Sequence, residues 1–142
     1  MSHASRWDSA AIRAGATVAL LLAVPLAVAA RIAAGRDDDT LAVALSIGAT
    51  LGFLVGAGWA AWVQRVGFPL SHGLVTAAGA YVAAQVAFIA VRLVRGQDVR
   101  WFGVLFTLTF VLFAGLLGGL AGQRLRSAGI EPPRFAMRKE PT

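Results

Sequence analysis

Four long apolar stretches, nearly free of formal charge, limit what this chain can fold into more than any other feature of its sequence. Each stretch is close to the roughly 20 residues that a helix needs to cross about 30 Å of hydrocarbon. A lone strand would leave its backbone polar groups unpaired in lipid, so each stretch is predicted to be a helix. The predicted membrane spans cover about residues 14–34, 41–63, 70–91 and 101–122.

The composition supports a membrane location for these helices. Of the 142 residues, 58% are hydrophobic and 14% are charged, and the mean hydropathy is +0.71. An ordinary soluble domain carries about 25% charged residues, so this chain lacks the charge to cover a soluble core. The length allows one domain. The chain contains no cysteine, which excludes disulfides, thiolate metal sites and thiol nucleophiles.

The connections between the spans are short and cover about residues 35–40, 64–69 and 92–100. Short connections make consecutive helices antiparallel neighbours, so the expected fold is an all-α, up-down bundle of four transmembrane helices. This domain is expected over residues 1–123. Residues 124–142 are predicted to form a basic, disordered tail, because Pro132 and Pro133 prevent the last helix from continuing.

The distribution of lysine and arginine predicts the orientation. With four spans, the N-terminal segment, the second loop and the tail share one side of the membrane and carry eight basic residues, against five in the other two loops. Basic residues in short loops favour the cytoplasmic side, so both termini are expected there. The arginine- and alanine-rich composition is typical of GC-rich bacterial genomes, and the expected location is therefore the bacterial cytoplasmic (inner) membrane.

The first span has an alternative interpretation. Basic residues precede it, and Ala27-Val28-Ala29 has the small-x-small pattern of a signal-peptidase site. A retained helix is favoured, because the apolar run is long enough to cross the bilayer and Pro25 is tolerated inside a membrane helix.

The two halves of the chain are weakly similar. Residues 31–37 match residues 92–98 at Arg, Gly and Asp, and the second and fourth spans both end in Gln-Arg, at residues 64–65 and 123–124. A duplicated two-helix hairpin would produce this pattern as a parallel repeat about an axis along the membrane normal. Chance similarity between segments rich in alanine, glycine, leucine and valine would also produce it, and both explanations stay open.

Glycines at a spacing of four form the most specific pattern. Such glycines create a flat groove along one helix face, where a second backbone can approach closely. Packing inside one chain is favoured over a homo-oligomer or partner face, although both remain open. The glycines predicted to pack helices are Gly48, Gly52 and Gly56 in the second span, and Gly115, Gly118, Gly119 and Gly122 in the fourth.

The order of the spans and two short motifs resemble those of a known group of proteins. A His72-Gly73 pair opens the third span, and the glycine-rich fourth span ends on Arg124. In these features the chain resembles small uncharacterised four-helix bacterial membrane proteins. The resemblance implies the four-helix layout and no activity.

The remaining polar residues are weak candidates for chemistry. The acidic run at residues 37–39 is expected to cap the second helix through Asp39 or Thr40, because its spacing does not match an alternating calcium loop. His72 is expected to form hydrogen bonds at the mouth of the third helix, with ligand or proton sensing as the alternative. Gln85 is expected to form a hydrogen bond to a neighbouring helix.

No aspartate, glutamate, lysine or arginine lies at mid-membrane depth, which disfavours proton- and cation-coupled transport. No catalytic residue, metal ligand or cofactor site is predicted. The positive charges lie at the ends of apolar runs, so lipid rather than nucleic acid is the expected partner. The basic residues predicted to attract anionic lipid headgroups are Arg124, Arg126, Arg134, Arg138 and Lys139.

These observations favour a non-enzymatic multi-pass membrane protein, an accessory, assembly or scaffold component that acts by helix packing. The alternative is a small oligomeric permease or pore for a neutral or weakly polar solute, and a membrane enzyme is a third option. A dry bundle with an exposed glycine face would favour the scaffold. A permease would be favoured if one cavity collected the polar side chains of Ser46, Thr50, Thr107 and Thr109.

Overall fold

The computed structural model describes residues 7–133. Within them the chain forms four helices and no strand, and each helix is long and apolar enough to cross a membrane. The chain is therefore a four-helix membrane bundle, as the apolar stretches predict. The helices are α1 (Ser9–Ala34), α2 (Asp39–Val63), α3 (Pro69–Val94) and α4 (Trp101–Ser127).

The helices extend beyond the apolar stretches into charged sequence. α1 begins at Ser9 and so includes Arg13, and α4 continues to Ser127 and so includes Arg124 and Arg126. The predicted boundaries were placed where the apolar sequence ends, whereas the helical backbone hydrogen bonds continue for another turn or more. The predicted tail residues Arg134, Arg138 and Lys139 lie outside the described residues.

The cap of α2 differs from the prediction. Asp38, not Asp39 or Thr40, is the N-cap, and its side chain accepts a hydrogen bond from the Leu41 N–H at 3.0 Å. The reason lies at the end of α1, where Asp37 takes a left-handed φ of 57°. The Asp38 N–H then bonds back to the Ala33 carbonyl at 3.1 Å, which leaves its side chain at the start of α2.

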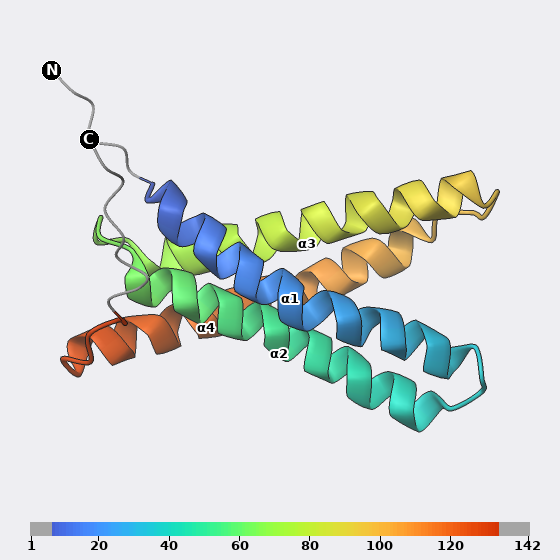
Figure 1. Cartoon of the computed structure of the whole chain (residues 1–142), viewed down its shortest axis with the longest axis horizontal. Coiled ribbons are helices and arrows are strands. Elements are labelled where there is room, and N and C mark those ends of the chain that lie inside the picture. Colours follow the sequence, from blue (N-terminus) through green and yellow to red (C-terminus); the bar gives the residue numbers. More distant parts are fainter. Residues whose placement is uncertain (1–6, 134–142) are drawn as a thin grey trace, which may run out of the picture.

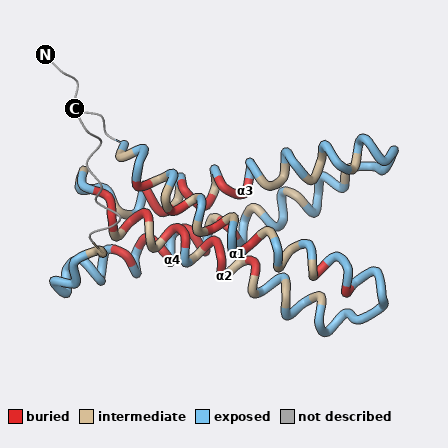
Figure 2. Tube along the Cα trace, viewed as in Figure 1, coloured by how far each residue is buried: buried red, intermediate tan, exposed pale blue. Residues whose placement is uncertain are grey.

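The helices form two antiparallel hairpins, α1–α2 and α3–α4, that cross each other (Figure 1). At the end where α1 begins and α4 ends the four helices lie together, and toward the connecting loops of each hairpin the pairs diverge. Buried residues accordingly concentrate in the centre and at the end where the four helices lie together (Figure 2). The predicted bundle is thus closed at one end and open at the other.

Residue size explains where the helices separate. The closed part of the core is built from alanine, and Ala19, Ala57 and Ala77 are fully buried. Lipid is as apolar as these side chains, so close packing rather than burial holds such helices together. Further along, Phe53 and Tyr81 meet edge to face with ring centroids 6.0 Å apart. These larger side chains fill the space where the hairpins begin to diverge.

Candidate binding cleft

The glycines predicted from the sequence lie at helix contacts inside the chain. A Cβ added to Gly52 would lie 2.9 Å from the Ala23 backbone nitrogen, and one added to Gly56 would lie 2.5 Å from the Gly15 carbonyl oxygen. Both contacts join α1 and α2. Gly48 is looser, because an added Cβ would meet only the tip of Leu26, at 3.2 Å.

The glycines of α4 face two different helices. A Cβ on Gly118 or Gly122 would collide with α2 around Gly58, and one on Gly115 would lie 2.9 Å from Ala77 Cβ on α3. A Cβ added to Gly119 would lie 3.2 Å from the Leu70 Cα of α3. The α4 glycines therefore allow this helix to fit between α2 and α3.

A polar network fixes the closed end. The Asp8 side chain caps α1 at the Ala11 N–H (3.0 Å) and also accepts a hydrogen bond from the Arg65 N–H (3.1 Å). The Asp8 N–H donates to Nε2 of His72 at 2.9 Å, and His72 Nδ1 lies 2.7 Å from the Phe68 carbonyl oxygen. This pattern assigns the neutral tautomer with the proton on Nδ1. His72 forms hydrogen bonds as expected, but it is fully buried.

The loop between α2 and α3 contributes the rest of this network. The Gln64 side chain accepts hydrogen bonds from the Val66 and Gly67 N–H groups, both at 2.9 Å. Arg126 donates to the Gln64 carbonyl, so this predicted headgroup residue also connects α4 to the loop. Arg124 is exposed. Of the side chains in this network, only His72 was expected from the sequence to form a hydrogen bond.

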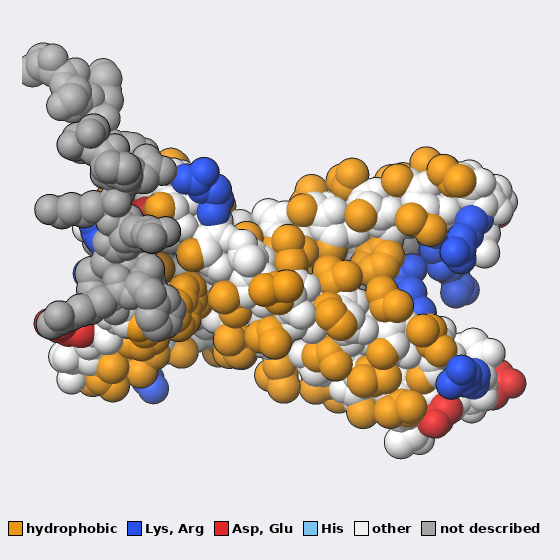
Figure 3. Space-filling view, in the orientation of Figure 1, with side chains coloured by type: hydrophobic (Ala, Val, Ile, Leu, Met, Phe, Trp, Pro, Cys, Tyr) orange, Lys and Arg blue, Asp and Glu red, His pale blue; other side chains and the backbone are white. Residues whose placement is uncertain are grey.

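The open end contains a cleft of about 930 Å³ between the hairpins. Space-filling spheres show hydrophobic side chains over both arms of the molecule and basic side chains where the arms separate (Figure 3). Phe53, Tyr81 and Val111 line the inner end of the cleft and also belong to the buried core. The cleft therefore ends inside the bundle instead of passing through it.

The walls of the cleft are mostly apolar, with a few hydroxyl and amide groups. Ser46, Thr50 and Thr107 line it, whereas Thr109 does not. The Ser46 hydroxyl donates to the Ala42 carbonyl at 2.8 Å, and Thr50 makes the same bond one turn later, so their oxygen lone pairs remain to accept from a ligand.

Tyr81 fixes the inner end of the α3 wall. Its hydroxyl donates to the Val104 carbonyl of α4 at 2.6 Å, and Gln85 and Thr107 lie close enough to this hydroxyl to interact with it. Gln85 lies one turn further along the same helix, and its expected bond to a neighbouring helix stays a prediction. Its amide also lines the cleft.

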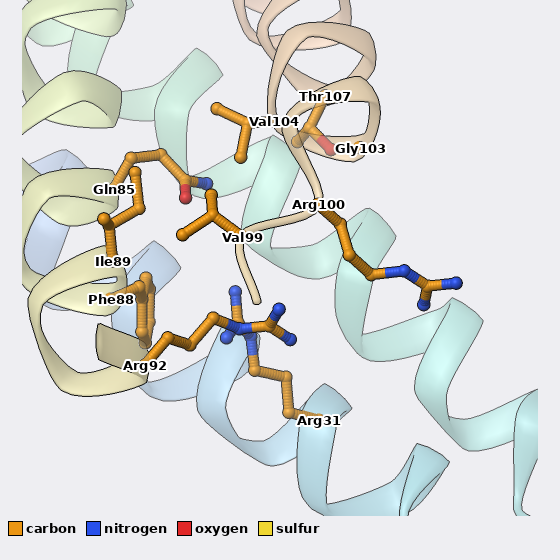
Figure 4. A pocket seen from close by; sticks show the side chains of 10 residues that line it. All are labelled: Arg31, Gln85, Phe88, Ile89, Arg92, Val99, Arg100, Gly103, Val104 and Thr107. Carbon is orange, nitrogen blue, oxygen red and sulfur yellow. The ribbon is translucent and has the colours of Figure 1, made fainter. Parts of the chain in front are cut away.

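A smaller pocket of about 200 Å³ adjoins the cleft near its mouth. Arg31, at the end of α1, and Arg92, at the end of α3, line this pocket, and their guanidinium groups converge (Figure 4). Arg100 also lines it but points away from the other two. The site therefore combines positive charge at the rim with an apolar interior, which suits binding of an amphiphilic molecule.

Within residues 7–133 no group of three or more His, Asp or Glu side chains is placed to hold a metal ion. No family model matches the sequence, and no curated protein or solved structure matches it either. The cleft and the multi-pass membrane fold are therefore the features that bear on function.

Proposed function

We propose that this chain is a non-enzymatic accessory, assembly or scaffold component of the membrane, and that it works by holding a largely apolar molecule in the cleft between its hairpins. The observation that supports this proposal is the division of the bundle into a closed end and an open end. The closed end is fixed by glycine contacts and by the Asp8–His72 network. The open end offers a cleft large enough for a small ligand.

The glycine contacts favour the cleft over a glycine face as the working surface. Gly52, Gly56 and Gly118 already lie against backbone atoms of neighbouring helices in the same chain. A second chain could use these grooves only after the bundle had opened. A homo-oligomer would therefore need another surface, such as the exposed side of α3 around Gly79, where an added Cβ meets nothing within 4 Å.

A small permease for a neutral or weakly polar solute is the second candidate. It is favoured by three of the four polar side chains expected in such a cavity, because Ser46, Thr50 and Thr107 line the cleft and only Thr109 does not. Because the cleft ends at Phe53 and Tyr81, transport would need the closed end to open, or an oligomer to form the path. Solute flux into liposomes containing the purified protein would support this candidate over the first.

The proposed location is the bacterial inner membrane with both termini in the cytoplasm, supported by the charge distribution between the loops. The cleft would then open toward the outer leaflet. Anionic lipids of the inner leaflet would meet Arg124 and the basic residues after it.

The test fills the cleft while leaving the fold in place. Ala27 and Ala84 both line the cleft, and Ala27→Trp/Ala84→Trp should occupy it. Val28→Trp/Val86→Trp is the matched control, because both valines are exposed and lie outside the cleft lining. Native mass spectrometry of protein purified in mild detergent should find a bound molecule on the wild type and the control, and lose it from the filled variant. Equal retention by all three proteins would refute the cleft as the binding site.

A further inference from the structure

The rim pocket and the cleft form one continuous site. Arg31, Gln85, Phe88 and Thr107 line both, so a molecule in the large cleft can place one end in the small pocket. The small pocket adds Arg92 and measures about 200 Å³, whereas the cleft measures about 930 Å³. The site is thus divided into a small charged compartment and a larger apolar one.

Each of the two arginines is positioned by a contact within the chain. The Arg31 guanidinium lies over the Phe88 ring, 4.4 Å from its centroid, and Arg92 Nη1 donates to the Asp98 carbonyl at 2.9 Å. The positive charges of Arg31 and Arg92 repel each other. Asp39 lines the opposite wall of the cleft, on α2. Two converging like charges favour an anion between them.

The depth of the cleft matches one leaflet. Along α1 the lining runs from Ala34 to Ala23, and its part from Arg31 inward to Ala23 spans eight residues, which corresponds to about 12 Å of helix. One leaflet contributes about 15 Å of the hydrocarbon core. A cation pair at the membrane border with an apolar cleft of this depth beneath it has the charge and length of a lipid binding site.

We propose that the cleft binds an anionic phospholipid from the leaflet on the side of the two hairpin loops. Its phosphate lies between Arg31 and Arg92, whose planar guanidinium groups suit phosphate oxygens. An acyl chain follows the wall formed by Ala27, Phe53 and Phe110. This inference rests on the proposed binding function of the cleft and names the ligand.

Two other occupants fit the site less well. A transmembrane helix of a partner needs about 20 residues of apolar groove, but the cleft ends near mid-membrane at Phe53 and Tyr81. A free phosphate would fill the rim pocket and leave the cleft empty. A phospholipid uses both compartments.

The experiment measures lipid binding to the delipidated full-length protein by native mass spectrometry, with phosphatidylglycerol, phosphatidylcholine and inorganic phosphate as probes. The wild type should retain one phosphatidylglycerol on the order of tenfold more tightly than phosphatidylcholine. Inorganic phosphate should not compete at equal concentration. Arg31→Gln/Arg92→Gln should abolish the preference for phosphatidylglycerol. Arg36→Gln/Arg95→Gln removes the same charge at the same end from exposed residues outside both cavities, and should keep the preference.

The outcomes separate this inference from the proposed function. Equal binding of the two lipids by the wild type, or an unchanged preference in Arg31→Gln/Arg92→Gln, would overturn the anionic-lipid assignment and leave the cleft as a binding site. Effective competition by inorganic phosphate would show a headgroup site without a chain site. Binding that also survives the cleft-filling tryptophans would refute the proposed function itself. Circular dichroism and thermal unfolding of each variant check that the bundle is intact.

Discussion

Gly52→Leu is expected to destabilise the single chain by forcing α1 away from α2. A Cβ at this position would lie 2.9 Å from the Ala23 nitrogen and 3.2 Å from the Ala23 Cα, closer than side-chain carbons normally approach. Because these are backbone atoms, no rotamer change relieves the collision. The helices must separate along the seam that also contains Gly56.

The size of this effect follows from the contacts that separation removes. A gap of about 0.5–1 Å already forfeits a quarter to a half of the dispersion energy of each contact, and overpacking of this kind costs about 1–3 kcal/mol. Gly79→Leu is the matched control, since nothing lies within 4 Å of an added Cβ there. Leucine forms helix better than glycine at both positions, so this gain cancels in the comparison.

The assay is thermal or denaturant unfolding in detergent, combined with a measurement of oligomeric state. Gly52→Leu should unfold at a lower temperature than Gly79→Leu by the equivalent of about 1–3 kcal/mol, with no change of mass in the folded fraction. Equal stability of the two variants would refute the packing argument. A stable monomer that has lost self-association would instead show that the Gly52 groove binds a second chain.

Three further predictions concern topology and hydrogen bonds. Reporter fusions after residue 142 and within residues 37–39 should report opposite sides of the membrane, with the C-terminal fusion cytoplasmic; fusions on the same side would contradict four spans. His72→Ala should lower the free energy of unfolding by about 1–3 kcal/mol, since it removes the acceptor of the Asp8 N–H, and should leave lipid binding at the other end unchanged; lost binding at unchanged stability would contradict this. Tyr81→Phe removes the bond to the Val104 carbonyl, which should cost about 0.5–1.5 kcal/mol in thermal unfolding; no loss would show that the bond is not stabilising.

The sequence predicts the four helices well because the hydrocarbon thickness sets their length directly. It predicts their ends less well. The cap at Asp38 depends on the left-handed backbone of Asp37, which in turn depends on how α1 terminates. The hydrogen bonds of Asp8 could not be predicted, because they form only once the fold brings the Arg65 backbone and the buried His72 ring next to it. A local sequence pattern does not indicate contacts between residues so far apart in the chain.

The cleft could not be predicted from hydropathy. A helix face that lines an apolar cleft and one that faces lipid have the same composition, because lipid is as apolar as leucine or valine. Thr107 and Thr109 look equivalent in the sequence, yet one lines the cleft and the other lies outside it. The crossing of the two hairpins decides between them, and that crossing depends on which glycines meet which helix.

One sequence pattern did indicate the pair of arginines that lines the small pocket. Arg31 and Arg92 occupy matching places in the two segments that suggest a duplicated hairpin. In a parallel repeat about an axis along the membrane normal, matching residues lie at the same depth. Residues that face the axis then also face each other, as the two guanidinium groups do (Figure 4). A glycine contact also joins each hairpin at the closed end, Gly15 with Gly56 and Gly73 with Gly115, but Gly73 lies nearly one turn away from the position that the arginine register would match with Gly15. Duplication remains a prediction, and within it the pair of like charges at the border of the cleft is the feature that a parallel repeat would explain directly.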